Sequence, residues 1–221
     1  MPALNEEASI ASVLSDIPKD RVRHIFVCDN GSTDRTREVA AEHGAQVLTA
    51  QRKGYGSACL AGIKRLQTLS TPPDIVVFLD ADYSDHPSEL PLVVAPIENE
   101  EAQLVIGSRS LGHLEKGAMQ PQQIFGNWLA TKLIKWIYNK EFTDLGPFRA
   151  VAYNTLMAMD MRDKDFGWTV EMQVKAAKMG IPSVEVPVSY RRRIGVSKVS
   201  GTIKGTVLAG HKILWTIFKL I

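Results

Sequence analysis

Residues 75–82 read Ile75-Val76-Val77-Phe78-Leu79-Asp80-Ala81-Asp82, an apolar run that ends in two aspartates. A short run rich in β-branched residues is typical of a buried strand in a parallel sheet. Runs of the same character, expected to be parallel strands, cover 24–28, 45–49 and 104–106. Helical patterns lie between them at 6–15, 33–43 and 57–69. This alternation predicts an α/β fold with an open, mostly parallel sheet and helices on both faces.

The pattern changes after about residue 111. We expect a long helix over 120–138, a loop interrupted by glycine and proline over 144–150, a helix over 168–178, a strand over 183–190 and a basic loop over 191–200. No internal repeat or linker separates these segments from the first half. Residues 1–200 are therefore expected to form a single domain.

The composition excludes several classes of protein. The chain has 221 residues, of which 45% are hydrophobic and 23% charged, so it is neither disordered nor a coiled coil. A formal charge of +2 is too small to indicate a nucleic-acid partner. Two cysteines, Cys28 and Cys59, cannot build a disulfide framework, which favours a reducing compartment. The N-terminus has no signal-peptide pattern, so we expect a cytoplasmic location.

The positive charge gathers at the C-terminus. From Val186 onward there are seven Lys and Arg and no acidic residue. Residues 201–221 place Ile, Val and Leu at helical spacing with lysines between them, which predicts an amphipathic basic helix. Two partners fit such a helix. One is the surface of an anionic membrane, contacted peripherally from its inner face; the other is the protein core or a second subunit.

The aspartates that follow the strand at 75–79 are candidates for chemistry. Residues i and i+2 of an extended chain point the same way, so the carboxylates of Asp80 and Asp82 can face one point. Hard oxygen ligands suit Mg²⁺ or Mn²⁺. A cation held there can neutralise a nucleoside diphosphate as it leaves. The alternative is a solvated acidic turn.

Two further segments lie at predicted carboxyl ends of strands, where ligands bind in open α/β sheets. Residues 29–34 read Asp-Asn-Gly-Ser-Thr-Asp, a turn followed by a helix cap. A turn does not explain Asp29, whose carboxylate is placed to accept from a ribose hydroxyl or a base N–H. There are two interpretations of the segment Lys53-Gly54-Tyr55-Gly56. In one, its glycines let the backbone approach a phosphate; in the other, the segment only begins a helix. Asn5-Glu6-Glu7 is equally consistent with a simple helix cap.

Together these segments resemble the family 2 glycosyltransferases of the A-type fold, and especially the branch of polyprenyl-phosphate and dolichyl-phosphate sugar synthases. The matching segments, in the family's order, are 2–7, 29–34, 53–58, 80–82, 107–109, 185–188 and 193–198. The resemblance implies a nucleotide-sugar-binding fold, with residues 1–110 binding the nucleotide and 111–200 the acceptor. It also implies inverting transfer of a sugar from a nucleoside-diphosphate sugar to an acceptor, with a lipid-linked phosphate among the acceptor classes.

The resemblance also implies roles for residues. The implied nucleotide-binding residues are Asn5, Glu7, Asp29, Lys53, Gly54, Asp80 and Ala81, and the metal ligands are Asp80 and Asp82. Phosphates or the acceptor would be met by Arg109, Arg149, Trp168, Arg193, Ser197 and Lys198. Asp82, Asp144 and Glu171 would be catalytic, the last two as alternative bases, although both also suit structural ion pairs. Trp128 and Trp136, eight residues apart on one helix, are expected in the core.

Three features depart from the family. An apolar strand normally precedes the segment at 2–7, so we expect either a late recorded start or a sheet without a central strand, and favour the former. Asn30 replaces a usual aspartate. Residues 120–124 lack the basic residue typical of lipid-phosphate members. Two other functions remain open, a nucleotidyltransferase and a catalytically silent module that binds nucleotide sugars.

Overall fold

The computed structural model describes residues 1–195 and 203–221. Within these ranges the strands form two sheets. The first sheet has the order β1-β2-β3 and is parallel, and its strands are Pro2–Ala3, Phe26–Asp29 and Gln46–Thr49. The second has the order β4-β6-β5-β7, with strands Ile75–Phe78, Arg149–Ala152, Leu104–Ser108 and Ser183–Pro187. The predicted α/β fold with a mostly parallel sheet is confirmed.

One strand of the second sheet was predicted as loop. β6 lies antiparallel between β4 and β5, with Val151 paired to both Val76 and Leu104. The prediction of a loop over 144–150 is therefore wrong for Arg149 and Ala150, which belong to β6. Gly146 and Pro147 turn the chain immediately before β6, and the strand itself is only four residues long. Because Ala150 and Val151 are fully buried between two apolar strands, tertiary packing decides their conformation.

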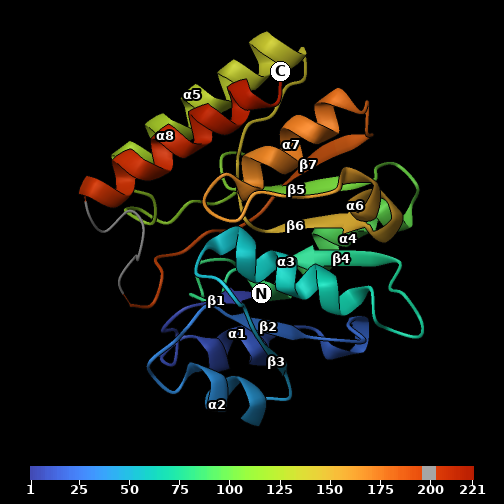
Figure 1. Cartoon of the computed structure of the whole chain (residues 1–221), viewed down its shortest axis with the longest axis vertical. Helices are drawn as coiled ribbons and strands as arrows, with labels where there is room; N and C mark the ends of the chain where they lie inside the picture. Colours follow the sequence, from blue (N-terminus) through green and yellow to red (C-terminus); the bar gives the residue numbers. More distant parts are fainter. Residues whose placement is uncertain (196–202) are drawn as a thin grey trace.

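The helices cover both faces of the sheets. They are α1 (Ile10–Asp16), α2 (Thr36–Glu42), α3 (Tyr55–Leu66), α4 (Leu90–Glu98), α5 (Pro121–Tyr138), α6 (Tyr153–Met159), α7 (Trp168–Lys178) and α8 (Ile203–Lys219). Figure 1 shows α1 and α2 beside β1–β3 at one end of the molecule, and α5, α7 and α8 together at the other end. The predicted C-terminal helix is thus present as α8, although α4 and α6 were not predicted.

The two faces of the second sheet bury different clusters. Leu104 and Ile106 point into a cluster that also contains Ile134 of α5 and Trp168 of α7. Val105, between them, points into the opposite cluster with Val93 of α4. This alternation is the period of two that a strand imposes on its side chains. It fixes which side of the sheet α5, α7 and α8 cover.

Trp128 and Trp136 are not in the core, so this expectation is wrong. Their exposed fractions are 53% and 80%. The buried positions of α5 are instead Asn127, Ala130, Thr131 and Ile134. Small residues on the buried face allow α5 to approach its neighbours closely, and the two indoles lie on the opposite side of the helix. Cys28 and Cys59 are both buried and carry free thiols, which agrees with the expectation that they build no disulfide framework.

A groove of about 550 Å³ separates β2 from β4. Residues from both strands line it, with side chains of α3 and α4 at its walls. The Met1 ammonium donates to the Phe26 carbonyl at 2.8 Å, and the Met1 carbonyl accepts from Cys28 N at 2.7 Å. Residues 1–3 therefore run beside β2 as a very short parallel strand, and the groove lies along the remainder of β2.

No helix within 1–195 and 203–221 combines the length and the apolar character that crossing a bilayer requires.

Candidate active site

A pocket of about 310 Å³ opens where β4 and β5 end. Asp80 and Asp82 follow β4, Arg109 follows β5, and Arg193 closes the side formed by the basic segment after β7. Part of the remaining wall comes from α5, through Gln122, Gln123, Gly126 and Asn127, and from α8, through Gly210 and Ile213. The structure therefore brings the two predicted metal ligands and two predicted phosphate-binding arginines around one space.

Asp80 is held by the first residue of α3. The Tyr55 hydroxyl donates to Asp80 Oδ1 at 2.9 Å. Burial and the negative charge of Asp82 raise the pKa of Asp80 to about 7, although the hydrogen bond from Tyr55 and the nearby arginines oppose that shift. Asp80 therefore exchanges its proton near neutral pH.

Asp82 is buried and fully engaged. Its Oδ1 accepts from Ser84 N at 2.9 Å and from Ser84 Oγ at 2.5 Å. Its Oδ2 lies 3.1 Å from Arg193 Nη1, while Arg193 Nη2 lies 2.8 Å from Glu6 Oε1. The guanidinium thus bridges carboxylates from the N-terminal segment and from the loop after β4.

The donor set at this position fits Mg²⁺ or Mn²⁺. Asp80 and Asp82, on either side of Ala81, both line the pocket and offer carboxylate oxygens to it. Across the described part of the chain, no group of three or more His, Cys, Asp or Glu side chains is arranged to hold a metal. Mg²⁺ commonly takes one or two carboxylates and fills its remaining positions with phosphates and water. Two aspartates therefore suit a cation that arrives with a phosphorylated ligand.

The predicted nucleotide-binding side is a set of backbone caps. Asp29 is buried and accepts from Ser32 N at 3.1 Å. Asn5 Oδ1 accepts from Thr33 N, and Glu7 Oε2 accepts from Arg35 N, both at 2.8 Å. These side chains hold the turn at 29–35, at the carboxyl ends of β1 and β2. They lie together as predicted, outside the lining of the pocket.

The loop before α3 connects this turn to Asp80. Asn30 Oδ1 accepts from Gly54 N at 3.0 Å, and Tyr55 follows directly. Gly54 has φ of 139°, and a Cβ placed on it would lie 2.1 Å from the carbonyl oxygen of Lys164. Only glycine fits there, so this position is structural. Lys53 lies beside Gly31 of the turn, and Ala81 is buried between the two aspartates.

Arg109 and Asp144 form a buried ion pair. Arg109 donates to Asp144 through its backbone N, Nε and Nη2 at 2.7, 2.8 and 2.6 Å. Its guanidinium also lies over the Tyr190 ring, 5.0 Å from the centroid. Asp144 is fully buried. Its carboxylate therefore fixes the direction of Arg109, and both of its oxygens are already occupied.

Two predicted acceptor-side residues, Arg149 and Trp168, lie behind the pocket wall. Arg149 is fully buried and donates to the carbonyls of Leu145, Gly146 and Thr169. Trp168 is 1% exposed and packs against Phe78 in the core. Burial leaves neither side chain a surface to offer to an acceptor, which corrects that expectation.

Glu171 is also buried, at 4% exposure. It accepts from Asp163 N at 2.7 Å and pairs with Lys175 at 2.7 Å. Of its two predicted roles, base or structural partner, these contacts match the second. Ser197 and Lys198 fall in 196–202, outside the described residues.

Several residues at the site were not singled out from the sequence. Tyr55 contacts Asp80, Tyr190 supports Arg109, and Glu185 accepts from the backbone N of Thr143 and Asp144. Asp85 is buried at 1% exposure, and burial together with the charges of Asp80 and Asp82 raises its pKa well above the usual range. Tyr55 and Glu185 lie within the matched segments, at 53–58 and 185–188, whereas no sequence signal marks Asp85.

Comparison with known proteins agrees with this geometry. The sequence profile of "Glycosyl transferase family 2" matches residues 1–158. An uncharacterized glycosyltransferase of Mycobacterium tuberculosis is 37% identical over 217 residues, which cover 95% of this chain and 92% of the relative. An undecaprenyl-phosphate mannosyltransferase of Micrococcus luteus is 32% identical over 227 residues, which cover 93% and 88%.

A solved structure shows the same fold. Glucosyl-3-phosphoglycerate synthase from Mycobacterium tuberculosis, in complex with Mn²⁺, UDP and phosphoglyceric acid, has a TM-score of 0.79 to this chain at 23% identity. The match covers 99% of this chain and 76% of that one. Since the profile spans most of the chain and both relatives exceed 30% identity over nearly its full length, the chain belongs to glycosyl transferase family 2.

Proposed function

We propose that the protein transfers a sugar, with inversion, from a nucleoside-diphosphate sugar to the phosphate of a lipid-linked acceptor. The observation that carries the proposal is the pairing of Asp80 and Asp82 with Arg109 and Arg193 around one pocket. Two carboxylates suit a divalent cation, and two arginines suit phosphates. The relative named undecaprenyl-phosphate mannosyltransferase supports this class of acceptor.

Asp80 and Asp82 would hold Mg²⁺ or Mn²⁺, which would supply positive charge to the diphosphate that leaves. The chain's own contribution is alignment and charge. Arg193, now between Glu6 and Asp82, would exchange part of this contact for a phosphate. Arg109, fixed by Asp144, would hold the second phosphate at the other side of the pocket.

The absence of an available base favours a phosphate acceptor over an alcohol. Among the described residues that line the pocket, the only carboxylates are Asp80 and Asp82. Asp144 is bound to Arg109 through both oxygens, and Glu171 is buried against Lys175. An alcohol must lose a proton as it attacks, whereas a phosphate monoester is already anionic. A phosphate nucleophile therefore needs only the charges that the pocket provides.

The nucleotide would lie along the carboxyl ends of β1 and β2. Asp29, Asn5 and Glu7 cap the turn at 29–35 there, and the loop of Lys53 and Gly54 joins that turn to Asp80 through Tyr55. Residues 1–110 would thus bind the donor and 111–200 the acceptor. A lipid-linked acceptor places the reaction at a membrane, with the protein peripheral to the inner face.

The test uses purified protein with UDP-, GDP- and dTDP-sugars and Mn²⁺. Stabilisation on heating ranks the donors, because a ligand that binds only the folded state raises the melting temperature. The preferred donor is then offered a polyprenyl phosphate and the matched polyprenol. We expect release of nucleoside diphosphate with the phosphate only, and NMR of the product should show an inverted anomeric configuration. Transfer to the polyprenol, retained configuration or release of pyrophosphate would contradict the proposal.

A further inference from the structure

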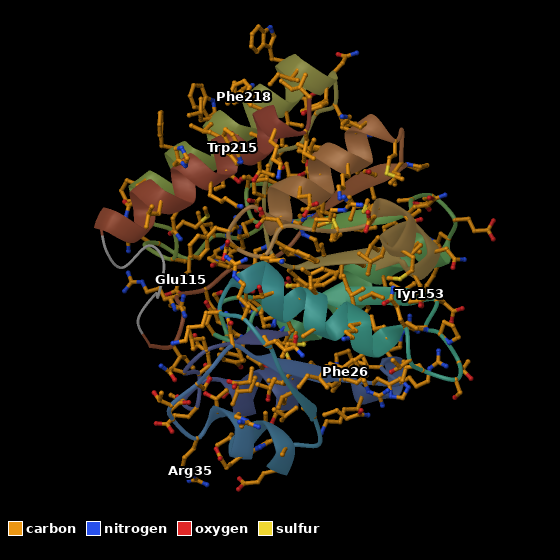
Figure 2. The ribbon with its side chains drawn as sticks, viewed as in Figure 1. Phe26, Arg35, Glu115, Tyr153, Trp215 and Phe218 are labelled. Carbon is orange, nitrogen blue, oxygen red and sulfur yellow. The ribbon has the colours of Figure 1, made fainter. Side chains whose placement is uncertain are left out.

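Three of the four tryptophans lie exposed on α5 and α8. Trp128 and Trp136 of α5 and Trp215 of α8 have exposed fractions of 53%, 80% and 55%, whereas Trp168 is 1% exposed. Phe125 and Phe218 add 60% and 50% exposure. Figure 2 shows Trp215 and Phe218 on α8, in the layer farthest from β1–β3. An exposed group of aromatic side chains is unusual on a water-soluble surface and marks a contact site.

On each helix these aromatics form one stripe. Phe125, Trp128, Lys132 and Lys135 follow helical spacing along the exposed side of α5, and the Phe125 and Trp128 rings lie 5.9 Å apart. Leu208, His211, Trp215 and Phe218 do the same on α8. The helices run side by side in Figure 1, and the Tyr138 hydroxyl of α5 donates to the Ile217 carbonyl of α8.

The charged side chains that belong to α5 and α8 are all basic. Neither α5 nor α8 contains an acidic residue in its sequence, while Lys132 and Lys219 are exposed. Two acids outside these helices pair with their lysines: Glu141 binds Lys135 and Asp163 binds Lys212, each at 2.8 Å. Tryptophan and phenylalanine combined with lysine are the composition of helices that lie in the interface of anionic membranes.

The same helices form the acceptor side of the pocket. Gln122, Gln123, Gly126 and Asn127 of α5 and Gly210 and Ile213 of α8 line it. Phe125 and Trp128 are their immediate sequence neighbours. A surface in contact with these aromatics is therefore next to the opening in which Arg109 and Arg193 lie.

We propose that the aromatic face of α5 and α8 docks on an anionic lipid bilayer, with Phe125, Trp128, Trp215 and Phe218 in the headgroup region. Two helices, rather than the C-terminal helix alone, make the contact. This contact presents the pocket to a phosphate at the membrane surface. That part of the inference rests on the proposed lipid-linked acceptor.

A second copy of the chain fits this face less well. Most symmetric dimers use the same patch on both subunits. Such a pairing would place the lysines of α5 and α8 opposite lysines, without an acidic residue from either helix. Anionic lipid headgroups neutralise them instead, with about 1 kcal/mol for each lysine near the surface.

The test is flotation of the purified full chain with vesicles of phosphatidylcholine containing about one third phosphatidylglycerol, as an anionic surface. These vesicles contain no polyprenyl phosphate, so binding does not depend on the proposed acceptor. We expect flotation that weakens at high salt and is lost on pure phosphatidylcholine. Because three of the four tryptophans lie on the face, their fluorescence should shift to the blue and be quenched by brominated lipid.

Variants locate the contact. Trp215→Ser with Phe218→Ser should weaken vesicle binding about tenfold or more, by loss of apolar burial in the interface. Leu92→Ser on α4 is the matched control, since Leu92 is 50% exposed, as is Phe218, and it should bind normally. Donor-induced thermal stabilisation should be unchanged in all of them, because none lines the pocket.

Two results would overturn the inference. One is absence of flotation by the unmodified chain. The other is a concentration-dependent dimer, seen by sedimentation without lipid, that the Trp215 and Phe218 changes abolish. Flotation without sugar transfer to polyprenyl phosphate would leave the membrane contact standing and count against the proposed function alone.

Discussion

Arg193 Nη1 lies 3.1 Å from Asp82 Oδ2, and the same guanidinium reaches Glu6, 187 residues away in the sequence. The arginine therefore neutralises the aspartate at the position proposed for a divalent cation. A cation and Arg193 share one carboxylate, so either the arginine turns toward a phosphate when the cation binds, or the two compete. Both outcomes make the pair the first target for mutation.

Asp82→Asn keeps the size of the side chain and removes its charge. We expect turnover to fall by more than about 100-fold, in line with loss of an electrostatic group at a reacting centre. Mn²⁺ binding measured by calorimetry should also be lost, while the circular dichroism spectrum stays unchanged. Asp74→Asn, at an exposed position, is the control and should behave as the unmodified chain. Near-normal activity of the Asp82 variant would defeat the metal assignment.

Arg193→Ala should affect use of the donor more than stability. Its side chain is 28% exposed, and its ion pairs lie at the pocket rather than in the core. We expect the KM for the nucleotide sugar to rise about tenfold, the cost of one charged hydrogen bond, with a small change in Tm. Arg192→Ala is the control: it removes a neighbouring arginine that is more exposed, and the KM should stay unchanged. An unchanged KM and rate in the Arg193 variant would refute its role.

The pKa of Asp80, raised to about 7, predicts pH-dependent metal binding. Below pH 7 the carboxyl holds a proton that the cation must displace. The apparent Mn²⁺ affinity should therefore fall by about tenfold for each pH unit below the pKa, as expected for release of one proton. Mn²⁺ titrations between about pH 5.5 and 8 measure this pH dependence of the affinity. An affinity that does not change with pH would contradict the assignment of Asp80 as a metal ligand.

The same shift has a consequence for stability without metal. A raised pKa means that folded Asp80 binds a proton that the unfolded chain has already released above its ordinary pKa of 3.8. The contribution of Asp80 to the free energy of unfolding is therefore greatest at low pH and is lost as the pH rises from about 4 to about 7. Thermal melts of the metal-free protein and of Asp80→Asn across this window isolate the contribution.

Tyr55→Phe tests the hydrogen bond that opposes this shift. The hydroxyl stabilises the ionised form of Asp80, so its removal should raise the pKa further. The midpoint of the Mn²⁺ titration should then move to higher pH. Tyr153→Phe changes a tyrosine of α6 outside the pocket and should leave the midpoint where it is. A downward movement in the Tyr55 variant would show that the hydroxyl acts in the opposite sense.

Asp144→Asn should destabilise the fold as well as the site. Removal of one partner from a buried ion pair leaves an uncompensated charge, which costs about 3 to 5 kcal/mol. Glu141→Gln, in the exposed pair with Lys135, is the matched control and should leave the denaturation midpoint almost unchanged. If Asp144 were a base, its variant would instead lose rate and retain its stability.

The sequence predicts the parts of the site that depend on short spacing. Asp80 and Asp82 follow an apolar strand, and their separation of two residues places both in the pocket. The ends of β4 and β5, near 80 and 108, also lie at one pocket, as expected for strands that run in the same direction, whereas the turn at 29–35 lies outside its lining.

The parts that depend on distant partners could not be predicted. Asp144 resembles a catalytic base until Arg109, 35 residues away, is seen to occupy it. Arg149 resembles a phosphate ligand until β6 places it inside the sheet, where backbone carbonyls satisfy it. The charge of a residue and its place in the sequence do not show whether it is exposed or buried. Packing against distant segments decides that.

Arg149 has one further consequence. It sits behind Leu145 and Thr169, which line the pocket, and its guanidinium binds their carbonyls. Burial lowers its pKa to about 10, which still leaves it protonated at neutral pH. An anion in the pocket therefore experiences the positive field of Arg149 from behind the pocket wall. No movement of a loop removes this charge, and the guanidinium needs no reorganisation when negative charge develops. In the proposed reaction, the buried guanidinium of Arg149 would thus help to hold the departing diphosphate without touching it.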